Sequence, residues 1–329
     1  MTDNMLIIDG LQYSNWSRQI FEQMHEGGVS AVHATLAYHE TTRDTLTRFG
    51  EWNRRFEDNA DLITPVKAPA DILRAKQEGR IGILLGAQNC SPIEDDIDMV
   101  AVMRDLGLMI MQLTYNNQSL LACGCYESED SGITRFGRQV IQEMNRVGMV
   151  IDMSHSAERS TLEAIEISQR PVIISHANPA SFYSAKRNKS DRVLKAIAEC
   201  DGLLGFSTYP FHLNHGSDCT LDEYCDMIAR TADLMGIEHI GIGTDLCQEQ
   251  PVSVLEWMRN GRWSKAMDYG EGNQNNAGWP APLTWLRDNR DFPNLIQGLR
   301  QRGFDDESVT RIMGRNWLGL LERAATPSA

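Results

Sequence analysis

Short apolar runs rich in β-branched residues recur along the chain, and a longer segment with helical periodicity follows most of them. This alternation is typical of a parallel sheet whose strands are buried on both faces and covered by helices. The expected strands are Met5–Asp9, Val29–Leu36, Ile81–Gly86, Leu108–Thr114, Met149–Ser154, Pro171–Ser175, Leu203–Ser207 and His239–Thr244. The clearest helical patterns are Asp95–Leu106, Thr134–Val147, Ala157–Ile167, Asp191–Cys200 and Leu221–Met235.

Eight strand–helix units favour a closed (β/α)8 TIM barrel over an open doubly wound sheet, which usually has fewer strands. The first strand also lacks the G-x-G-x-x-G turn that binds phosphate in open sheets. We therefore expect residues 1–329 to form one α/β domain, a (β/α)8 barrel. The polar segment at about 248–294 carries four Trp residues and a Gly/Asn-rich stretch, and it is predicted to be an insertion or lid after the eighth strand.

Composition narrows the range of partners. The chain has 31 Lys and Arg against 45 Asp and Glu, so its average surface would repel a nucleic acid backbone. No apolar run approaches the roughly 18 residues of a membrane span, and Met1–Asp9 lacks the pattern of a signal peptide. Seven cysteines without a C-x-x-C pair indicate reduced thiols. We expect a cytoplasmic protein that binds neither nucleic acid nor membrane, and a homodimer is left open.

Polar residues stand where the predicted strands end, which is where (β/α)8 barrels carry their catalytic groups. They are Gln12, His33, Gln88, Tyr115, His155, His176, Thr208 and Asp245. His155 and His176 each follow an apolar strand and a serine, and Asp245 follows the eighth strand. Two neutral imidazoles on neighbouring strands can reach one divalent metal, and the carboxylate can orient or deprotonate a water there.

A single histidine at a strand end is more often a hydrogen-bonded structural residue than a metal ligand. Two consecutive strands that both end in Ser-His, together with Thr-Asp on the eighth, favour an active site instead. His33 is an alternative ligand, although it also occupies an ordinary strand position. Glu127 and Glu129 follow the fourth predicted strand and are alternative candidates for a general base.

Three motifs carry a family resemblance. They are Ile151-Asp152-Met153-Ser154-His155, then Ser175-His176-Ala177-Asn178 with Arg187-Asn188 and Asp191 after it, and Gly241-Ile242-Gly243-Thr244-Asp245. With them the chain resembles the membrane dipeptidase (renal dipeptidase) family of zinc peptidases over most of its length. The resemblance implies an amidohydrolase-like barrel of the metal-dependent hydrolase type, in which two bridged zinc ions hydrolyse dipeptides and related small amides.

The resemblance also implies roles for individual residues. His155 and His176 match the ligands of the second zinc, and Asp245 matches the active-site aspartate near the attacking water. Arg187 matches the residue that grips the substrate carboxylate, a task that suits the guanidinium fork because it pairs with both oxygens.

The chain departs from the family pattern at the metal site. Where the family has Asp-Gly-His-x-Asp, Leu11 and Tyr13 replace both ligands of the first zinc. Gln88 replaces the bridging glutamate, and Tyr115 replaces a histidine that contacts the reacting substrate. By the period-two rule Leu11 and Tyr13 both point to the barrel centre, where they would fill the space of a metal. We therefore expect one divalent metal, zinc by the resemblance.

The sequence thus predicts a metal-dependent hydrolase of a dipeptide or related small amide with a free carboxylate. His155 and His176 are the expected metal ligands. Asp245 is the expected general base, and Tyr115 is expected to donate a hydrogen bond to the developing oxyanion.

Arg187, Asn188 and Gln88 are the residues expected to bind this small-molecule substrate. The alternative is a non-hydrolytic member of the family, a binding protein or a lyase-like enzyme that keeps the pocket without a working metal centre.

Overall fold

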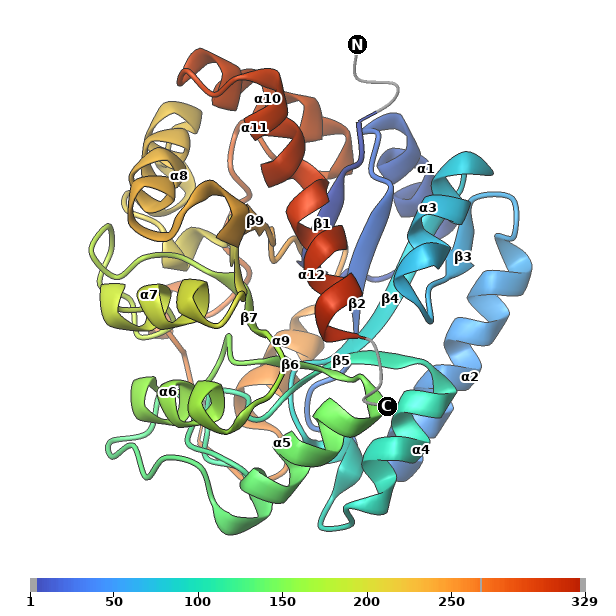
Figure 1. Cartoon of the computed structure of the whole chain (residues 1–329), viewed down its shortest axis with the longest axis vertical. Helices are drawn as coiled ribbons and strands as arrows, with labels where there is room; N and C mark the ends of the chain where they lie inside the picture. Colours follow the sequence, from blue (N-terminus) through green and yellow to red (C-terminus); the bar gives the residue numbers. More distant parts are fainter. Residues whose placement is uncertain (1–4, 267, 326–329) are drawn as a thin grey trace.

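The parallel strands of the protein curl into a nearly closed barrel with helices around it (Figure 1). The computed structural model describes residues 5–266 and 268–325. Eight strands are neighbours in the order β1-β2-β4-β5-β6-β7-β8-β9, and β3 pairs with β4 outside this path. The strands are β1 Ile8–Gln12, β2 Ala31–Ala37, β3 Ile63–Pro65, β4 Ile81–Ala87, β5 Leu108–Gln112, β6 Val150–Asp152, β7 Val172–Ala177, β8 Leu203–Phe206 and β9 Ile240–Ile242. The predicted (β/α)8 barrel and its eight strands are confirmed, with strand ends shifted by a few residues.

Strand β3 is the one that the sequence did not predict. It has three residues, and its Ile63 and Pro65 lie opposite Ile81 and Ile83 of β4. A run this short shows no period, and a proline removes one hydrogen-bond donor from the ladder. The strand therefore depends on its neighbour rather than on a local signal.

Backbone and side-chain hydrogen bonds close the barrel between its first and last strands. Tyr13 N donates to Leu246 O at 3.1 Å, and Asp245 N donates to Leu11 O at 3.0 Å. The buried carboxylate of Asp9 accepts hydrogen bonds from the Thr244 N–H at 2.7 Å and the Thr244 hydroxyl at 2.6 Å. This closure places Asp245, which follows β9, beside the end of β1. Segments from both ends of the chain therefore meet at the barrel mouth.

Twelve α-helices lie between and after the strands within the described ranges. They are α1 Arg18–Glu26, α2 Thr42–Asp58, α3 Pro69–Gln77, α4 Asp98–Leu106, α5 Arg135–Val147, α6 Glu158–Ile167, α7 Asp191–Glu199, α8 Leu221–Met235, α9 Val252–Asn260, α10 Phe292–Gln301, α11 Asp306–Thr310 and α12 Asn316–Ala324. Local capping explains several boundaries: the Thr134 hydroxyl accepts from Gly137 N at the start of α5, and Gly148 ends α5 with a φ of 71°. The five predicted helical patterns correspond to α4, α5, α6, α7 and α8.

Helix α12 covers the amino end of the barrel, where it crosses the strands in the foreground of Figure 1. Its Trp317 is 1% exposed and donates from Nε1 to Ile242 O at 2.8 Å. A Cβ on Gly10 would lie 2.2 Å from the indole, so only glycine leaves room for this ring. The apolar floor leaves the opposite, carboxyl end for polar groups.

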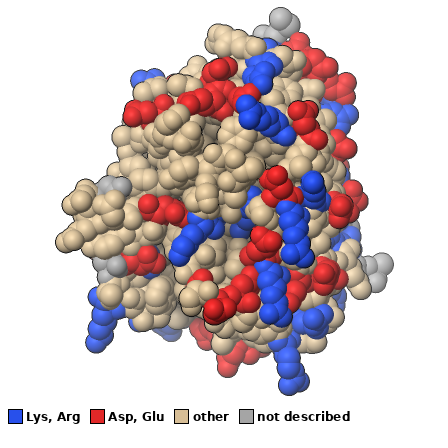
Figure 2. Space-filling model, turned by 90° about the vertical axis from the view of Figure 1, so that its left-hand side faces the viewer, with Lys and Arg blue, Asp and Glu red and all other residues tan. Residues whose placement is uncertain are grey.

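The outer faces of the helices carry intermixed charges. Figure 2 shows acidic and basic side chains interspersed on the side of the molecule where α6, α7 and α8 lie in Figure 1. Ion pairs between neighbouring turns account for part of this pattern, as in Arg159 with Glu163 and Arg230 with Asp226. None of the helices in the described ranges combines the length and apolar character that a bilayer crossing requires.

Candidate active site

Two imidazole groups meet at the carboxyl ends of β6 and β7. The Nε2 atoms of His155 and His176 are 3.0 Å apart, and both rings are buried. Burial, followed by the nearby charge of Arg187, holds the pKa of both imidazoles well below its usual value. Both rings are therefore neutral at pH 7, the form that binds a metal.

Hydrogen bonds on the far side of each ring fix its tautomer. His155 Nδ1 lies 2.6 Å from Asn116 Oδ1, and His176 Nδ1 lies 2.7 Å from Ser175 Oγ. The Ser175 hydroxyl donates to Asp152 Oδ2 at 2.5 Å, so its oxygen accepts the proton of His176 Nδ1. Since Nδ1 carries the proton in both rings, the two Nε2 lone pairs face each other. Lone pairs at this separation repel unless a cation lies between them.

The donors around this point fit one divalent cation. Gln88 Oε1 is 3.0 Å from His155 Nε2, and Gln88 Nε2 donates to Thr35 Oγ1 at 2.9 Å, which turns the amide oxygen toward the imidazoles. Imidazole nitrogen and amide oxygen both bind divalent metals, but none of these donors is negatively charged. In the described part of the chain, no group of three His, Cys, Asp or Glu residues is placed to hold a metal. The donor set suits a single cation rather than a bridged pair.

The opposite side of the barrel mouth is filled by aromatic and apolar side chains. Leu11, Tyr13, Tyr38 and Tyr115 form one buried cluster, with Tyr13 and Tyr38 edge to face at 6.4 Å between ring centroids. Tyr115 also stacks on His155, with 4.2 Å between the centroids and 23° between the planes. Leu11 and Tyr13, which were predicted to point to the barrel centre, are both buried in this cluster.

Asp245 follows β9 and presents a buried carboxylate to the cavity. Its φ is 59°, a conformation that costs a non-glycine residue about 1 to 3 kcal/mol and is most often found at functional sites. Burial raises the pKa of this carboxyl to about 7, while the charge of Arg187 acts in the opposite direction. A carboxylate that titrates near neutral pH is suited to accept a proton.

Arg187 supplies a buried cation to the same cavity. Its side chain is 2% exposed, and the guanidinium donates to the carbonyl oxygens of Ser154 and His176. No carboxylate of the described residues lies within ion-pairing distance, 4.0 Å, of this group. The charge therefore lies near the imidazole pair without an ion pair to a described residue, and it acts on the Asp245 carboxylate across the cavity.

Four of the eight residues predicted at strand ends line one cavity of about 60 Å³, whereas His176 is fully buried beside His155 and does not line it. The barrel and the segments that follow its strands contribute Tyr13, Gln88, Tyr115, Asn116, His155, Arg187 and Asp245, and the segment after β9 contributes Met258, Arg259, Tyr269 and Glu271. A neighbouring cleft of about 400 Å³ shares Asp245 and Tyr209 with this cavity. The segment predicted as an insertion thus forms one wall of the site.

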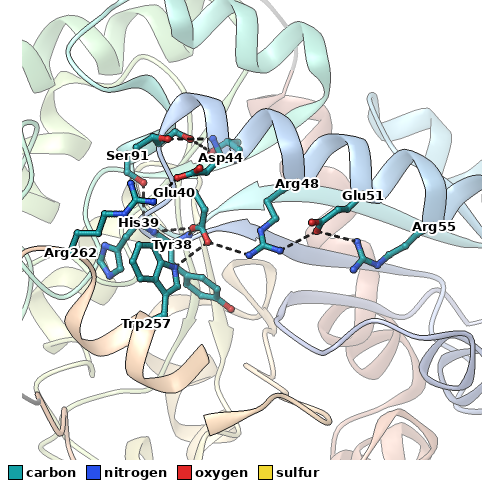
Figure 3. Close-up of polar contacts among 12 residues, drawn as sticks. Tyr38, His39, Glu40, Asp44, Arg48, Glu51, Arg55, Ser91, Trp257 and Arg262 are labelled. Atoms are coloured by element: carbon teal, nitrogen blue, oxygen red, sulfur yellow. Dashed lines mark hydrogen bonds and ion pairs between the residues drawn. The ribbon is translucent and has the colours of Figure 1, made fainter. Parts of the chain in front are cut away.

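Figure 3 shows how α9 of this insertion is fixed to the segment after β2. The buried Glu40 carboxylate accepts hydrogen bonds from Tyr38 N at 2.6 Å and from Trp257 Nε1 at 3.0 Å. His39 Nε2 lies 3.1 Å from Met258 O, and the exposed Arg262 donates to Asp44 at 2.8 Å. These contacts hold the last turns of α9 over the cavity.

Several residues considered from sequence lie elsewhere. Asn188 does not reach the cavity wall, because its Nδ2 donates to Tyr183 O and His212 O while its Oδ1 accepts from Asn178 N. His33 donates from Nδ1 to Gly10 O at 2.7 Å, and its ring packs against Gly86. The Glu127 carboxylate accepts from Gln118 N in its own loop. These side chains are engaged in holding the backbone.

Other residues were missed. Asn116, which orients His155, directly follows Tyr115, and a search for polar residues one position beyond each strand end would have found it. Lys189 gives no such signal: it is buried and donates to Ser156 O at 2.7 Å beneath the site. The contact of Lys189 joins segments 33 residues apart, so local pattern does not reveal it.

Comparison with known proteins agrees with this geometry. Residues 13–259 match the model of the family described as membrane dipeptidase (peptidase family M19). The chain belongs to the membrane dipeptidase family. It is 24% identical to dipeptidase tcpJ of Claviceps purpurea over 89% of this chain and 62% of that protein, and 25% identical to dipeptidase verJ of Clonostachys rogersoniana over 87% and 66%. The chain thus spans less than two thirds of the length of these curated relatives.

Solved structures give the same fold. An amidohydrolase from Pseudomonas aeruginosa is 36% identical, with a TM-score of 0.94 over 98% of both chains. A metallopeptidase from Rhodobacter sphaeroides, solved with a phosphinate mimic of L-Ala-D-Ala, has a TM-score of 0.79 at 17% identity over 97% of this chain and 99% of that one. The first likeness extends over the whole chain, and the second supports the barrel alone.

Proposed function

We propose that this member of the membrane dipeptidase family hydrolyses a dipeptide or related small amide that carries a free carboxylate, with one divalent metal, zinc, at its active site. The observation that carries the proposal is the pair of His155 and His176 Nε2 atoms, 3.0 Å apart, each with its other nitrogen held by a hydrogen bond. Gln88 Oε1 is the third donor near this point. When bound, the metal supplies Lewis acidity at the base of the cavity.

The protein side chains would perform the remaining steps. Arg187 binds the substrate carboxylate, since its buried charge forms no ion pair with a described residue. Asp245 accepts a proton from the attacking water, for which a pKa of about 7 is appropriate. Tyr115 lines the cavity beside His155, and its hydroxyl donates to the oxyanion that develops on the amide.

The size of the cavity favours a small substrate. Side chains from the barrel and from α9 line about 60 Å³, and the neighbouring cleft of about 400 Å³ shares Asp245 and Tyr209 with it. The insertion would act as a lid over the reacting amide, with α9 fixed by Glu40 and His39.

Metal analysis combined with turnover tests this function. The protein is purified without chelator, its metal content is measured by elemental analysis, and hydrolysis is followed for dipeptides and N-acyl amino acids. We expect close to one metal per chain, loss of turnover after chelation and recovery with zinc. A protein that binds these compounds but cleaves none of them at any metal load would instead be a non-hydrolytic member of the family.

A further inference from the structure

Two buried guanidinium groups line the cavity from different walls. Arg187 follows β7 and donates to the carbonyl oxygens of Ser154 and His176, on the side of the imidazole pair. Arg259 belongs to the last turn of α9 and donates to Ala277 O at 2.6 Å, on the side of the insertion. Both side chains are at least nine-tenths buried. The two groups therefore reach the cavity from independent supports.

Neither guanidinium forms an ion pair with a described residue. Within residues 5–266 and 268–325, no carboxylate oxygen lies within 4.0 Å of either group. Arg262, three positions after Arg259, differs because it is exposed and pairs with Asp44 at 2.8 Å. The carbonyl oxygen of Ala277 satisfies one donor of Arg259 but carries no charge, and the Asp245 and Glu271 carboxylates that also line the cavity lie beyond ion-pairing distance. A buried charge of this kind costs free energy that an anionic ligand would recover.

The backbone around Arg259 is held in place. Trp257 Nε1 donates to the Glu40 carboxylate (Figure 3). Met258 O lies 3.1 Å from His39 Nε2. A side chain on a fixed support loses less conformational freedom when it binds a ligand. Arg259 is thus prepared to bind an anion at a defined place in the cavity.

We propose that Arg259 is a second carboxylate anchor and that the substrate contains an acidic amino acid, with its α-carboxylate on Arg187 and its side-chain carboxylate on Arg259. This inference rests on the proposed amide hydrolysis and narrows its substrate to a dipeptide or N-acyl derivative of Glu or Asp. Two planar forks on separate walls match two carboxylates, each through paired hydrogen bonds.

Binding of free amino acids tests the anchor without turnover. Isothermal titration calorimetry on the zinc-loaded protein compares L-glutamate with L-glutamine and L-aspartate with L-asparagine, pairs that differ only in the side-chain carboxylate. We expect the wild-type protein to prefer the acid by at least about tenfold in one pair, the scale of a charge-assisted hydrogen bond. Arg259→Met should abolish this preference while changing the affinity for the amide less than about threefold.

Two further variants separate the anchor from the structural role of Arg259. Arg262→Met removes the same charge from an exposed position of the same segment and should keep the preference. Arg259→Lys keeps the charge and should keep part of the preference, which provides a result if Arg259→Met fails to fold. No preference in the wild-type protein, or an equal loss of affinity for acid and amide in Arg259→Met, would overturn the proposal. A protein that shows the preference but cleaves no amide would contradict the proposed hydrolysis and leave the anchor standing.

Discussion

The two sides of the barrel mouth differ in what their strand ends carry. On the β6–β7 side, His155 and His176 are backed by Asp152, whose carboxylate accepts the hydroxyl protons of Ser154 and Ser175 at 2.5 Å each. On the β1–β2 side, Leu11, Tyr13 and Tyr38 form part of an apolar cluster. The same end of one barrel therefore holds a buried polar network beside a packed aromatic wall.

The contrast shows that the two halves of the mouth are stabilised differently, one by hydrogen bonds and the other by packing. On the polar side, the Asp152 carboxylate and the Ser154 and Ser175 hydroxyls satisfy one another, whereas both amide atoms of Gln112 have no hydrogen-bond partner. The aromatic half contains no group that needs a cation, and its rings fill the volume that ligands and waters would otherwise take. The packing of the aromatic side therefore does not depend on the hydrogen bonds of the polar side.

The largest effect is expected from breaking the polar side. His176→Ala removes one of the two imidazole donors, so metal content should fall below about a tenth per chain and amide hydrolysis by more than about 1000-fold, because a metal contributes several kcal/mol. Elemental analysis and initial rates measure both. His215→Ala is the matched control, since His215 is exposed and pairs with Glu223 away from the cavity. Full activity without metal would contradict the role of this side.

Asp245 joins the two sides, and its loss should be the next largest effect. Asp245→Asn should lower turnover by roughly 100-fold while the metal is retained, the usual scale for a general base. Because the pKa of this carboxyl is about 7 and the base must be ionised, wild-type kcat should rise with pH through about 7. The variant should lose this rise. If it kept both the rate and the pH profile, the base would have to be another group.

The buried ammonium group of Lys189 is expected to lower the stability of the folded protein. Burial, followed by the charge of Arg187, lowers the pKa of this lysine to about 7, below the value near 10.5 expected in the unfolded chain. The unfolded state therefore binds more protons between pH 7 and 10.5, and wild-type stability should rise with pH across that window.

Lys189→Met removes this ammonium group. It should stabilise the protein by about 2 to 4 kcal/mol at pH 6, with a gain that shrinks as the pH approaches 10. Chemical denaturation at both pH values measures the difference. Lys186→Met, at an exposed neighbouring position, should change stability by less than about 0.5 kcal/mol. A pH-independent gain would mean that the ammonium group is solvated in the folded state.

The smallest change is expected from refilling the aromatic side with ligands. The triple substitution Leu11→His, Tyr13→Asp and Gln88→Glu supplies two donors on β1 and an anionic bridge near His155. If the aromatic wall occupies the place of a lost metal, metal content should increase from about one to about two per chain. The single change Tyr13→Phe is the control and should leave it at one. Two metals in the wild-type protein would show that the aromatic side does not limit the site.

Much of the barrel was predictable because each strand carries its own apolar run. The exceptions are instructive: β3 has three residues and ends in Pro65, too little for a period to appear. For the segment at about 248–294, the sequence indicated only that it is polar. The position of α9 could not be predicted, because it depends on contacts with Glu40 and His39, more than 200 residues earlier in the chain.

The sequence by itself determined the eight strands and the residue types at their carboxyl ends, because these depend on local period and on identity at single positions. Only the tertiary structure decided that His155 and His176 bring their Nε2 atoms to 3.0 Å, that Asn188 holds a loop instead of lining the cavity, and that Arg259 lines the cavity with Arg187. These outcomes depend on distances between segments far apart in the chain. Such distances are fixed by barrel closure and by hydrogen bonds between loops, neither of which leaves a periodic trace in the sequence.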